Sequence, residues 1–222
     1  MPLKVLTLNL CTTWTSPRKK RLKMVADFVN ANGIDVLLVQ EGVRSCLVYD
    51  TIRQLAGLLD YDYFAKASWG FPFFFESMTA VISRFKIIRT ASFSCEVPQT
   101  DWEDAMPIPW RARAVSATVD VPDLGITTLV SVHLTSSPKT VADKAKQLKM
   151  VSDWKAGLPE RDVTIYGGDF NTSFDGEPKD KMFGVEPDYI FVEGATLAKG
   201  YQVLTGMVVT DHEGGVVAEV TK

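Results

Sequence analysis

The stretch from Thr164 to Asn171 (TIYGGDFN) limits what this chain can form more than any other part of the sequence. It begins as a short apolar run typical of a buried strand, continues with two glycines, and ends with Asp169 and Asn171 two positions apart. Glycine has no Cβ atom, so another group can approach this backbone closely. A buried strand that delivers a carboxylate and an amide at its end predicts a site for a metal ion or a phosphate.

Length and composition predict one globular domain over residues 1–222. Hydrophobic residues make up 46% of the 222 residues, enough for one sizeable core but few for two. The net charge of −3 is unlike that of proteins that bind nucleic acid through a basic surface, although a local basic groove stays compatible with it. The three cysteines are widely spaced, so neither a zinc knuckle nor a disulfide framework is expected. We expect a cytoplasmic monomer without a membrane span, with a secreted mature form as the alternative.

The pattern of elements predicts an α/β (α+β) fold in which two β-sheets face each other with helices outside. Leu3–Leu10 alternates apolar and polar residues as a strand does, and Val36–Val39 is an apolar run suited to a buried strand that ends at Gln40-Glu41. The other expected elements are a helix over 46–59 and strands near 61–65, 78–83, 87–93, 111–121, 126–132, 188–192, 195–204 and 216–220. The aromatic-rich segments 69–75 and 95–110 are expected to be loops.

Two further helices are expected where a capping serine precedes a proline, after Ser16 and after Ser137. The first ends at Asn32-Gly33 and the second near Gly157. Their predicted buried stripes are Leu22, Val25, Phe28 and Val29 in the first, and Val141, Ala145, Leu148, Val151 and Trp154 in the second.

Polar residues recur at the ends of the expected strands. They are Asn9, Glu41, His133, Asp169, Asn171, Asp188, Asp211 and His212. An Asn or Asp alone just past a strand is most often a turn residue that bonds its own backbone, and a lone His is more often a satisfied structural group than a catalyst. The chain has only two histidines, however, and both belong to this set. So many carboxylate, amide and imidazole groups against apolar strands predict one shared site.

The chemistry that suits this set is the hydrolysis of a phosphate ester with Mg²⁺. Mg²⁺ prefers oxygen ligands and is typically held by one or two carboxylates, several waters and the substrate phosphate. It polarises phosphoryl oxygens and offsets charge on the leaving oxygen. A histidine held by a carboxylate can move protons near neutral pH, and amide N–H groups can donate to phosphate oxygens.

The motifs in their order resemble the endonuclease/exonuclease/phosphatase superfamily, whose members include pancreatic-type deoxyribonuclease and neutral sphingomyelinases. The motifs are Leu8-Asn9, Gln40-Glu41, Val81-Ile-Ser-Arg84, His133-Leu134, Gly168-Asp-Phe-Asn171, Asp188-Tyr-Ile-Phe191 and Asp211-His212. They span nearly the whole chain. The resemblance implies a four-layer αββα sandwich of two facing mixed β-sheets flanked by helices.

The resemblance also implies a metal site and a water site. Glu41 looks like the main ligand of Mg²⁺, for which Mn²⁺ is expected to substitute, with Asn9 and Asp211 nearby. Asp169 looks like the residue that positions or activates the attacking water.

On the phosphate side the resemblance implies four further residues. Asn171 looks like a phosphate ligand. His212 looks like the imidazole that acts on the reacting oxygens, with Asp188 orienting it. His133 looks like a second imidazole near the leaving group or the scissile phosphate.

Three other features bear on the substrate. Arg111 and Arg113 stand at the alternate positions that form the apolar face of the strand expected over 111–121. Either could open into a crevice and clamp a phosphate, or could lie at a solvated strand end. Trp69 stands in an aromatic segment that could stack bases, grip an acyl or aryl group, meet a membrane interface or cap the core. The basic run Pro17–Lys23 is interpreted as the solvated face of a helix rather than a nucleic-acid contact.

The sequence therefore predicts a Mg²⁺-dependent phosphoesterase that cleaves a phosphodiester by in-line attack of water, either a nuclease or a general phosphodiesterase. A small-molecule or lipid phosphodiesterase or phosphatase, of the sphingomyelinase kind, is the alternative. A binding module that has lost catalysis on the same fold is the more distant one.

Overall fold

The computed structural model describes residues 1–11, 18–45, 49–71, 75–95, 112–135, 141–174, 181–205 and 214–222. The described elements follow in the order β1 (Leu3–Asn9), α1 (Arg18–Asn32), β2 (Val36–Ser45), β3 (Tyr49–Asp50), α2 (Thr51–Leu59), β4 (Tyr63–Phe71), β5 (Phe75–Ser83), β6 (Ile87–Cys95), β7 (Ala112–Val121), β8 (Gly125–His133), α4 (Val141–Ala156), β9 (Val163–Asp169), β10 (Met182–Val185), β11 (Asp188–Glu193), β12 (Thr196–Val203) and β13 (Gly215–Thr221).

The strands form two mixed sheets. The first sheet has seven strands in the order β12-β13-β1-β2-β5-β4, with β3 paired to β2. The second has six strands in the order β10-β11-β9-β8-β7-β6. Each sheet contains a parallel pair, β1 with β2 and β8 with β9, among antiparallel neighbours. Parallel neighbours need a crossover connection, and α1 and α4 supply it for these two pairs.

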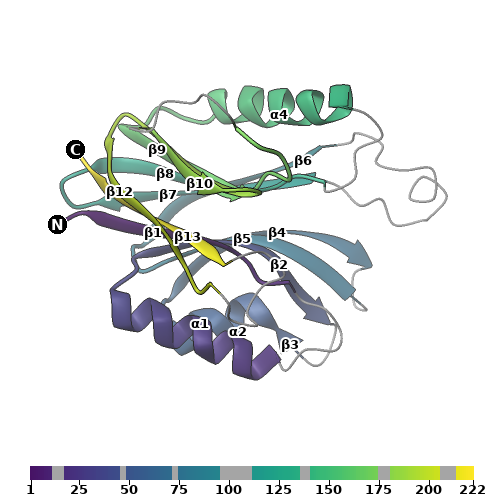
Figure 1. The fold of residues 1–222 in the computed structure, drawn as a ribbon, viewed down its shortest axis with the longest axis vertical. Coiled ribbons are helices and arrows are strands. Elements are labelled where there is room, and N and C mark those ends of the chain that lie inside the picture. The colour runs from purple at the N-terminus through teal and green to yellow at the C-terminus, as the bar shows by residue number, and fades with distance from the viewer. Residues whose placement is uncertain are drawn as a thin grey trace.

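The two sheets lie face to face, with α1 and α2 covering the outer face of the first and α4 the outer face of the second (Figure 1). The side-chain alternation of β2 explains the layers. Leu37 and Val39 belong to the core under α1 and α2, whereas Val36 and Leu38 belong to the core between the sheets. A third core lies between the second sheet and α4. The predicted four-layer αββα sandwich is confirmed.

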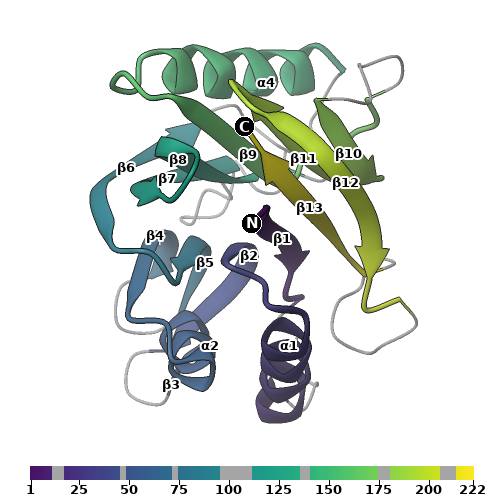
Figure 2. The same ribbon diagram turned by 90° about the vertical axis from the view of Figure 1, so that its left-hand side faces the viewer.

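The two ends of the chain lie side by side because β1 pairs antiparallel with β13, with Leu3 opposite Val220 (Figure 2). Asn9, at the other end of β1, therefore lies at the far end of the sandwich from both termini. None of the described helices is long and apolar enough to cross a membrane. The single domain over residues 1–222 stays a prediction.

Helix α1 follows its predicted stripe, since Leu22, Val25 and Val29 are buried and Phe28 is half-buried. Gly33 ends it with a φ of 59°, in the left-handed region that glycine adopts without strain. Helix α4 differs from its prediction, because Ala145 is exposed and the polar residues Lys144, Gln147 and Lys155 lie on the buried stripe instead.

Three other expectations need correction. The helix predicted from residue 46 begins at Thr51, because Asp50 accepts a hydrogen bond from the amide of Arg53 at 3.0 Å and caps it there. The aromatic segment 69–75 is not simply a loop, since Trp69 lies within β4 and the strand β5 begins at Phe75. The short strand β10 was not predicted, because its four half-buried residues carry little alternation.

Candidate active site

The strand pairing brings the predicted polar residues to one end of the sandwich. In the first sheet, the parallel register sets Asn9 beside Gln40. In the second sheet, His133 lies beside Asp169 in the parallel pair, and Asp188 lies beside Asp169 in the antiparallel pair. The carboxyl ends of both parallel pairs therefore meet where the two sheets face each other.

A β-bulge in β2 positions Glu41. Val39 pairs with Ala80 and Gly42 with Met78, so β2 has one residue more than β5 between these pairs. Glu41 takes a φ of 53°, which a non-glycine residue adopts only under local constraint. The prediction that β2 ends at Gln40-Glu41 is wrong, because the strand continues past the bulge to Ser45. Bulges re-aim side chains, and this one leaves both Gln40 and Glu41 in contact with groups between the sheets.

Gln40 ties the two sheets together beneath the site. It is fully buried, and its Nε2 donates to Ser131 Oγ of β8 at 3.0 Å. Ser131 Oγ in turn donates to the carbonyl of Val39 at 3.2 Å. A buried amide without partners would be costly, so this chain of hydrogen bonds fixes β2 against β8.

Asn9 lies at the centre of the site. Its side chain is fully buried, and its Nδ2 donates to Asp169 Oδ2 at 3.0 Å and to Glu41 Oε1 at 3.2 Å. Its Oδ1 accepts from the amide of Cys11 at 2.8 Å, which fixes the orientation of the amide group. His133 Nε2 lies 3.5 Å from Asp169 Oδ2 and 3.9 Å from Glu41 Oε1. One amide thus holds two carboxylates next to an imidazole.

The two glycines of the Thr164–Asn171 stretch allow Asp169 to reach this position. Gly168 has a φ of 149°, and a Cβ atom there would lie 1.9 Å from the carbonyl oxygen of Val132. After the strand, the amide of Asn171 donates to Asp169 Oδ1 at 2.9 Å. The side-chain amide of Asn171 donates to the carbonyl of Leu134 at 2.9 Å, which joins the segments that follow β8 and β9.

Of the remaining predicted residues, three are described and three lie outside the described residues. Asp188 is 2% exposed and lines a small hollow together with Gln202 and Gly214. Arg113 is half-buried and lies opposite His133 in the register of β7 and β8. Trp69 is half-buried on the face of β4 that carries Ala65 and Ala67 between the sheets. Arg111, Asp211 and His212 lie outside the described residues.

The sequence matches the model of the endonuclease/exonuclease/phosphatase family over residues 6–212. The chain belongs to this family. No curated protein matches the sequence significantly.

Solved structures share the fold. An endonuclease/exonuclease/phosphatase family protein from Leptotrichia buccalis has a TM-score of 0.74 at 18% identity, over 99% of this chain and 100% of that one. D. rerio TDP2 complexed with single strand DNA product has a TM-score of 0.69 at 14% identity, over 99% of each chain. A mannosyl-6-phosphatase from Bacteroides thetaiotaomicron has a TM-score of 0.67 at 16% identity, over 99% of this chain and 100% of that one.

The donors around Glu41 indicate which metal ion they suit. The described residues contain no group of three or more His, Cys, Asp or Glu side chains arranged to hold a metal ion. Mg²⁺ needs no such group, because it keeps several waters and takes one or two carboxylates. The Glu41 side chain is 34% exposed, while Asn9 holds one of its oxygens from the buried side. A half-exposed, oriented carboxylate fits Mg²⁺, and it does not fit a closed zinc site, which takes four Cys or His ligands.

The sequence interpretation missed Arg21. The sequence predicts that the basic run Pro17–Lys23 is a solvated face, and Lys19, Lys20 and Lys23 are indeed exposed. Arg21, however, is 6% exposed, and its Nη1 donates to the carbonyl of Leu10 at 2.5 Å and to that of Cys11. These carbonyls directly follow Asn9. Arg21 stands four residues before Val25, which is on the buried stripe of α1, and this helical spacing is the one feature of the sequence that indicates its burial.

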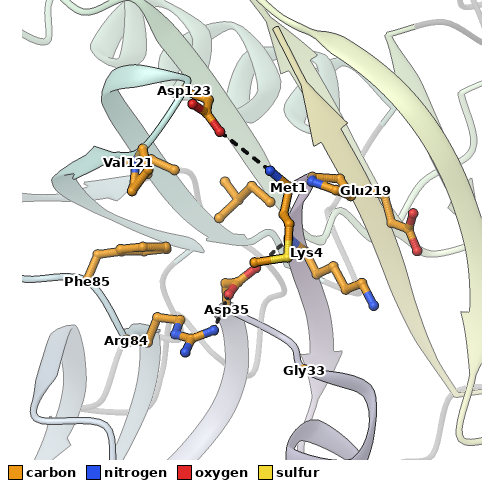
Figure 3. Close-up of a pocket in the computed structure, with 12 residues that line it drawn as sticks. Met1, Lys4, Gly33, Asp35, Arg84, Phe85, Val121, Asp123 and Glu219 are labelled. Atoms are coloured by element: carbon orange, nitrogen blue, oxygen red, sulfur yellow. Dashed lines mark hydrogen bonds and ion pairs between the residues drawn. The ribbon is translucent and has the colours of Figure 1, made fainter.

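A cavity of about 810 Å³ lies at the opposite end of the sandwich, beside the start of β1 (Figure 3). Four of the charged groups that line it form two ion pairs. Arg84 Nη1 lies 2.7 Å from Asp35 Oδ1, and the amino group of Met1 lies 3.4 Å from Asp123 Oδ2. None of the predicted site residues lines this cavity, so its chemistry is separate from that around Asn9.

Proposed function

We propose that this protein is a Mg²⁺-dependent phosphoesterase that hydrolyses a phosphodiester by in-line attack of water. The observation that carries the proposal is the contact of one buried amide, Asn9, with both Glu41 and Asp169, beside the imidazole of His133. A buried carboxylate such as Asp169, held 3.0 Å from Asn9 beside a second carboxylate, is costly to assemble for stability alone. Two carboxylates held in this way are typical of a site that binds a cation and a water molecule.

Glu41 would hold Mg²⁺ from the described residues, and Asp211 is proposed to join it. When bound, the ion would polarise the phosphoryl oxygens and offset charge on the leaving oxygen. Asn9 orients the Glu41 carboxylate through its Nδ2 and is kept in that orientation by the amide of Cys11. Mn²⁺ is expected to replace Mg²⁺, since both take oxygen ligands.

Asp169 is proposed to position the attacking water and accept its proton. Its Oδ2 accepts from Asn9 and its Oδ1 from the amide of Asn171, so the carboxylate cannot rotate freely. As the water attacks phosphorus, the bond to the leaving oxygen breaks and that oxygen needs a proton. His133, 3.5 Å from Asp169, is proposed to act near the leaving oxygen. His212, oriented by Asp188, is proposed to act on the phosphate oxygens, with Asn171 as a phosphate ligand.

The substrate is proposed to lie between Trp69 of the first sheet and Arg113 of the second. An arginine can clamp a phosphate, and Arg111, two positions before Arg113 in the sequence, is a second candidate. An aromatic side chain can stack on a base of a single strand. Together with the similarity to TDP2, solved with a single-strand DNA product, these residues favour a nuclease.

A small phosphate ester is the second candidate substrate. The net charge of −3 is unfavourable for tight binding of a long polyanion, and the mannosyl-6-phosphatase shares the fold. A binding module without catalysis is disfavoured, because the described part of the site keeps Asn9, Glu41, His133 and Asp169 together.

Hydrolysis of four substrates would test the proposal: supercoiled plasmid, single-stranded oligonucleotide, bis-p-nitrophenyl phosphate and p-nitrophenyl phosphate. Each is assayed with Mg²⁺ and with EDTA. Mg²⁺-dependent nicking of plasmid or shortening of the oligonucleotide would support a nuclease. Cleavage of only the small diester or monoester would support the second candidate. No hydrolysis of any substrate by folded protein that binds Mg²⁺ would favour the binding module.

A further inference from the structure

The buried stripe of α4 carries polar residues where apolar ones would be expected. Lys144, Gln147 and Lys155 are 8%, 0% and 9% exposed, alongside the apolar Val151. A long polar side chain buried under a helix needs specific partners, and a buried lysine needs them most. The partners of Lys144 and Gln147 lie at the active-site end of the second sheet.

Lys144 contacts the backbone directly after the two site-bearing strands. Its Nζ donates to the carbonyl of Thr135, two residues after His133, and to the carbonyl of Phe170, one residue after Asp169, at 3.3 Å. Gln147 Oε1 accepts from the amide of Thr135 at 3.4 Å. Helix α4 therefore binds both polar backbone groups of Thr135 and joins the ends of β8 and β9.

The burial of Lys144 has an energetic cost. Desolvation lowers the pKa of its ammonium group to about 8, although the attraction of Asp169 opposes this shift. An apolar residue such as methionine would fill the same space without that cost. Lys155, near the C-terminal end of α4, is also buried. It pairs with Glu193, and its Nζ lies 3.8 Å from the ring centroid of Tyr166, remote from the site.

We propose that Lys144 is a positioning residue that holds His133 and Asp169 in their relative geometry from behind the site. It touches neither substrate nor metal. It fixes the two strand ends through their carbonyls, and it adds a positive charge on the buried side of Asp169. This role rests on the proposed phosphoesterase function, because positioning matters to catalysis only where the site is catalytic.

The test compares Lys144→Met, Lys144→Arg and the matched control Lys155→Met with the wild type. Lys144→Met is expected to lower kcat roughly 10- to 100-fold with little change in KM, because a misplaced catalytic group slows the chemical step. Lys144→Arg, which keeps the charge and the donors, is expected to restore most of kcat. Lys155→Met is expected to keep kcat, whatever it does to the melting temperature. If Lys144→Met does not fold, Lys144→Gln replaces it, with an intermediate loss of kcat expected.

Hydrogen exchange gives a readout that needs no activity. The amides of Leu134 and Asn171 donate to Asp169, and they are expected to exchange faster in Lys144→Met but not in Lys155→Met. Unchanged kcat in Lys144→Met, or equal losses in both methionine variants, would overturn the positioning role. If even the wild type hydrolyses nothing, the proposed function fails. Hydrogen exchange then still tests whether Lys144 fixes the segments after β8 and β9. Unchanged exchange of the Leu134 and Asn171 amides in Lys144→Met would overturn that claim.

Discussion

Asn9 and Asp169 stand 160 positions apart in the sequence, yet Asn9 Nδ2 lies 3.0 Å from Asp169 Oδ2 across the interface of the two sheets. Each residue ends a strand of a parallel pair, one pair in each sheet. The same Nδ2 lies 3.2 Å from Glu41 Oε1, so the proposed metal-binding and water-positioning carboxylates are held by one amide. The site thus depends on how the sheets face each other.

Replacing Asn9 with alanine should therefore disturb both carboxylates. We expect a loss of about 1–3 kcal/mol in the free energy of unfolding, because the buried carboxylate of Asp169 loses its donor. We also expect kcat to fall by roughly 100-fold, because Glu41 and Asp169 are no longer oriented. Urea denaturation and steady-state kinetics would measure the two effects. The exposed Asn30→Ala on α1 is the control, and similar kinetics in both variants would contradict the central role of Asn9.

The tie between Gln40 and Ser131 should contribute to stability rather than to chemistry. Ser131→Ala is expected to cost about 1 kcal/mol, because Gln40 Nε2 loses one buried acceptor. Gln40→Met combined with Ser131→Ala should cost less than the two single changes added together, since no unpaired partner is left behind. A double-mutant cycle by urea denaturation measures this coupling. Purely additive costs would show that the cross-sheet bond contributes nothing.

Arg21 should stabilise the segment after β1 in the way proposed for Lys144 after β8 and β9. Arg21→Met is expected to lower the free energy of unfolding by about 1.5–3 kcal/mol, because charge-assisted bonds to the carbonyls of Leu10 and Cys11 are lost. Lys23→Met on the same helix removes only an exposed pair with Asp27 and should cost less than about 0.5 kcal/mol. Equal losses in the free energy of unfolding in the two variants would contradict a stabilising role for the bonds of Arg21 to these carbonyls.

Lys144 should make stability depend on pH in a defined window. Its pKa is about 8 in the folded protein and near 10.5 when unfolded, so the unfolded state binds more protons between these values. The stability of the wild type relative to Lys144→Met should therefore rise from about pH 8 to pH 10.5, as the buried ammonium loses its proton. Asp169 is the charged group that opposes this shift. Thermal melts of both proteins across this range measure the difference, and a flat or falling difference would contradict the burial of a charged Lys144.

Much of this site could be predicted because strand ends are visible in the sequence. A buried strand is an apolar run, and a polar residue just after it marks the edge where parallel strands end together. His133 and Asp169 follow this rule, and the structure sets them side by side in adjacent parallel strands, with Asp188 opposite Asp169 at the start of the antiparallel strand β11. The sandwich itself follows from the same pattern together with the order of the motifs.

Glu41 shows what the alternation of residues cannot reveal. Its approach to Asn9 depends on a bulge, and an extra residue in one strand is defined only against its partner strand. The sequence therefore predicted the end of a strand where the chain continues through a distortion.

The partners of the buried cations could not be predicted for a related reason. Arg21 and Lys144 bind backbone carbonyls, which every residue possesses, so no partner stands out in the sequence. A charged residue on a helix is usually solvated. Only its position on the apolar stripe distinguishes such a residue, and in α4 the expected stripe itself was wrong at Ala145.

The most direct test of the proposed function is the Mg²⁺ dependence of phosphodiester hydrolysis in the wild type, Glu41→Gln and Asp169→Asn, with folding of each protein checked by circular dichroism. We expect the wild type to need Mg²⁺, and both folded variants to lose at least about 1000-fold in kcat, since each removes a group acting on the reacting centre. Glu41→Gln should in addition lose the Mg²⁺-dependent rise in melting temperature that the wild type shows. Wild-type rates in either folded variant would contradict the assignment of this site as the catalytic centre.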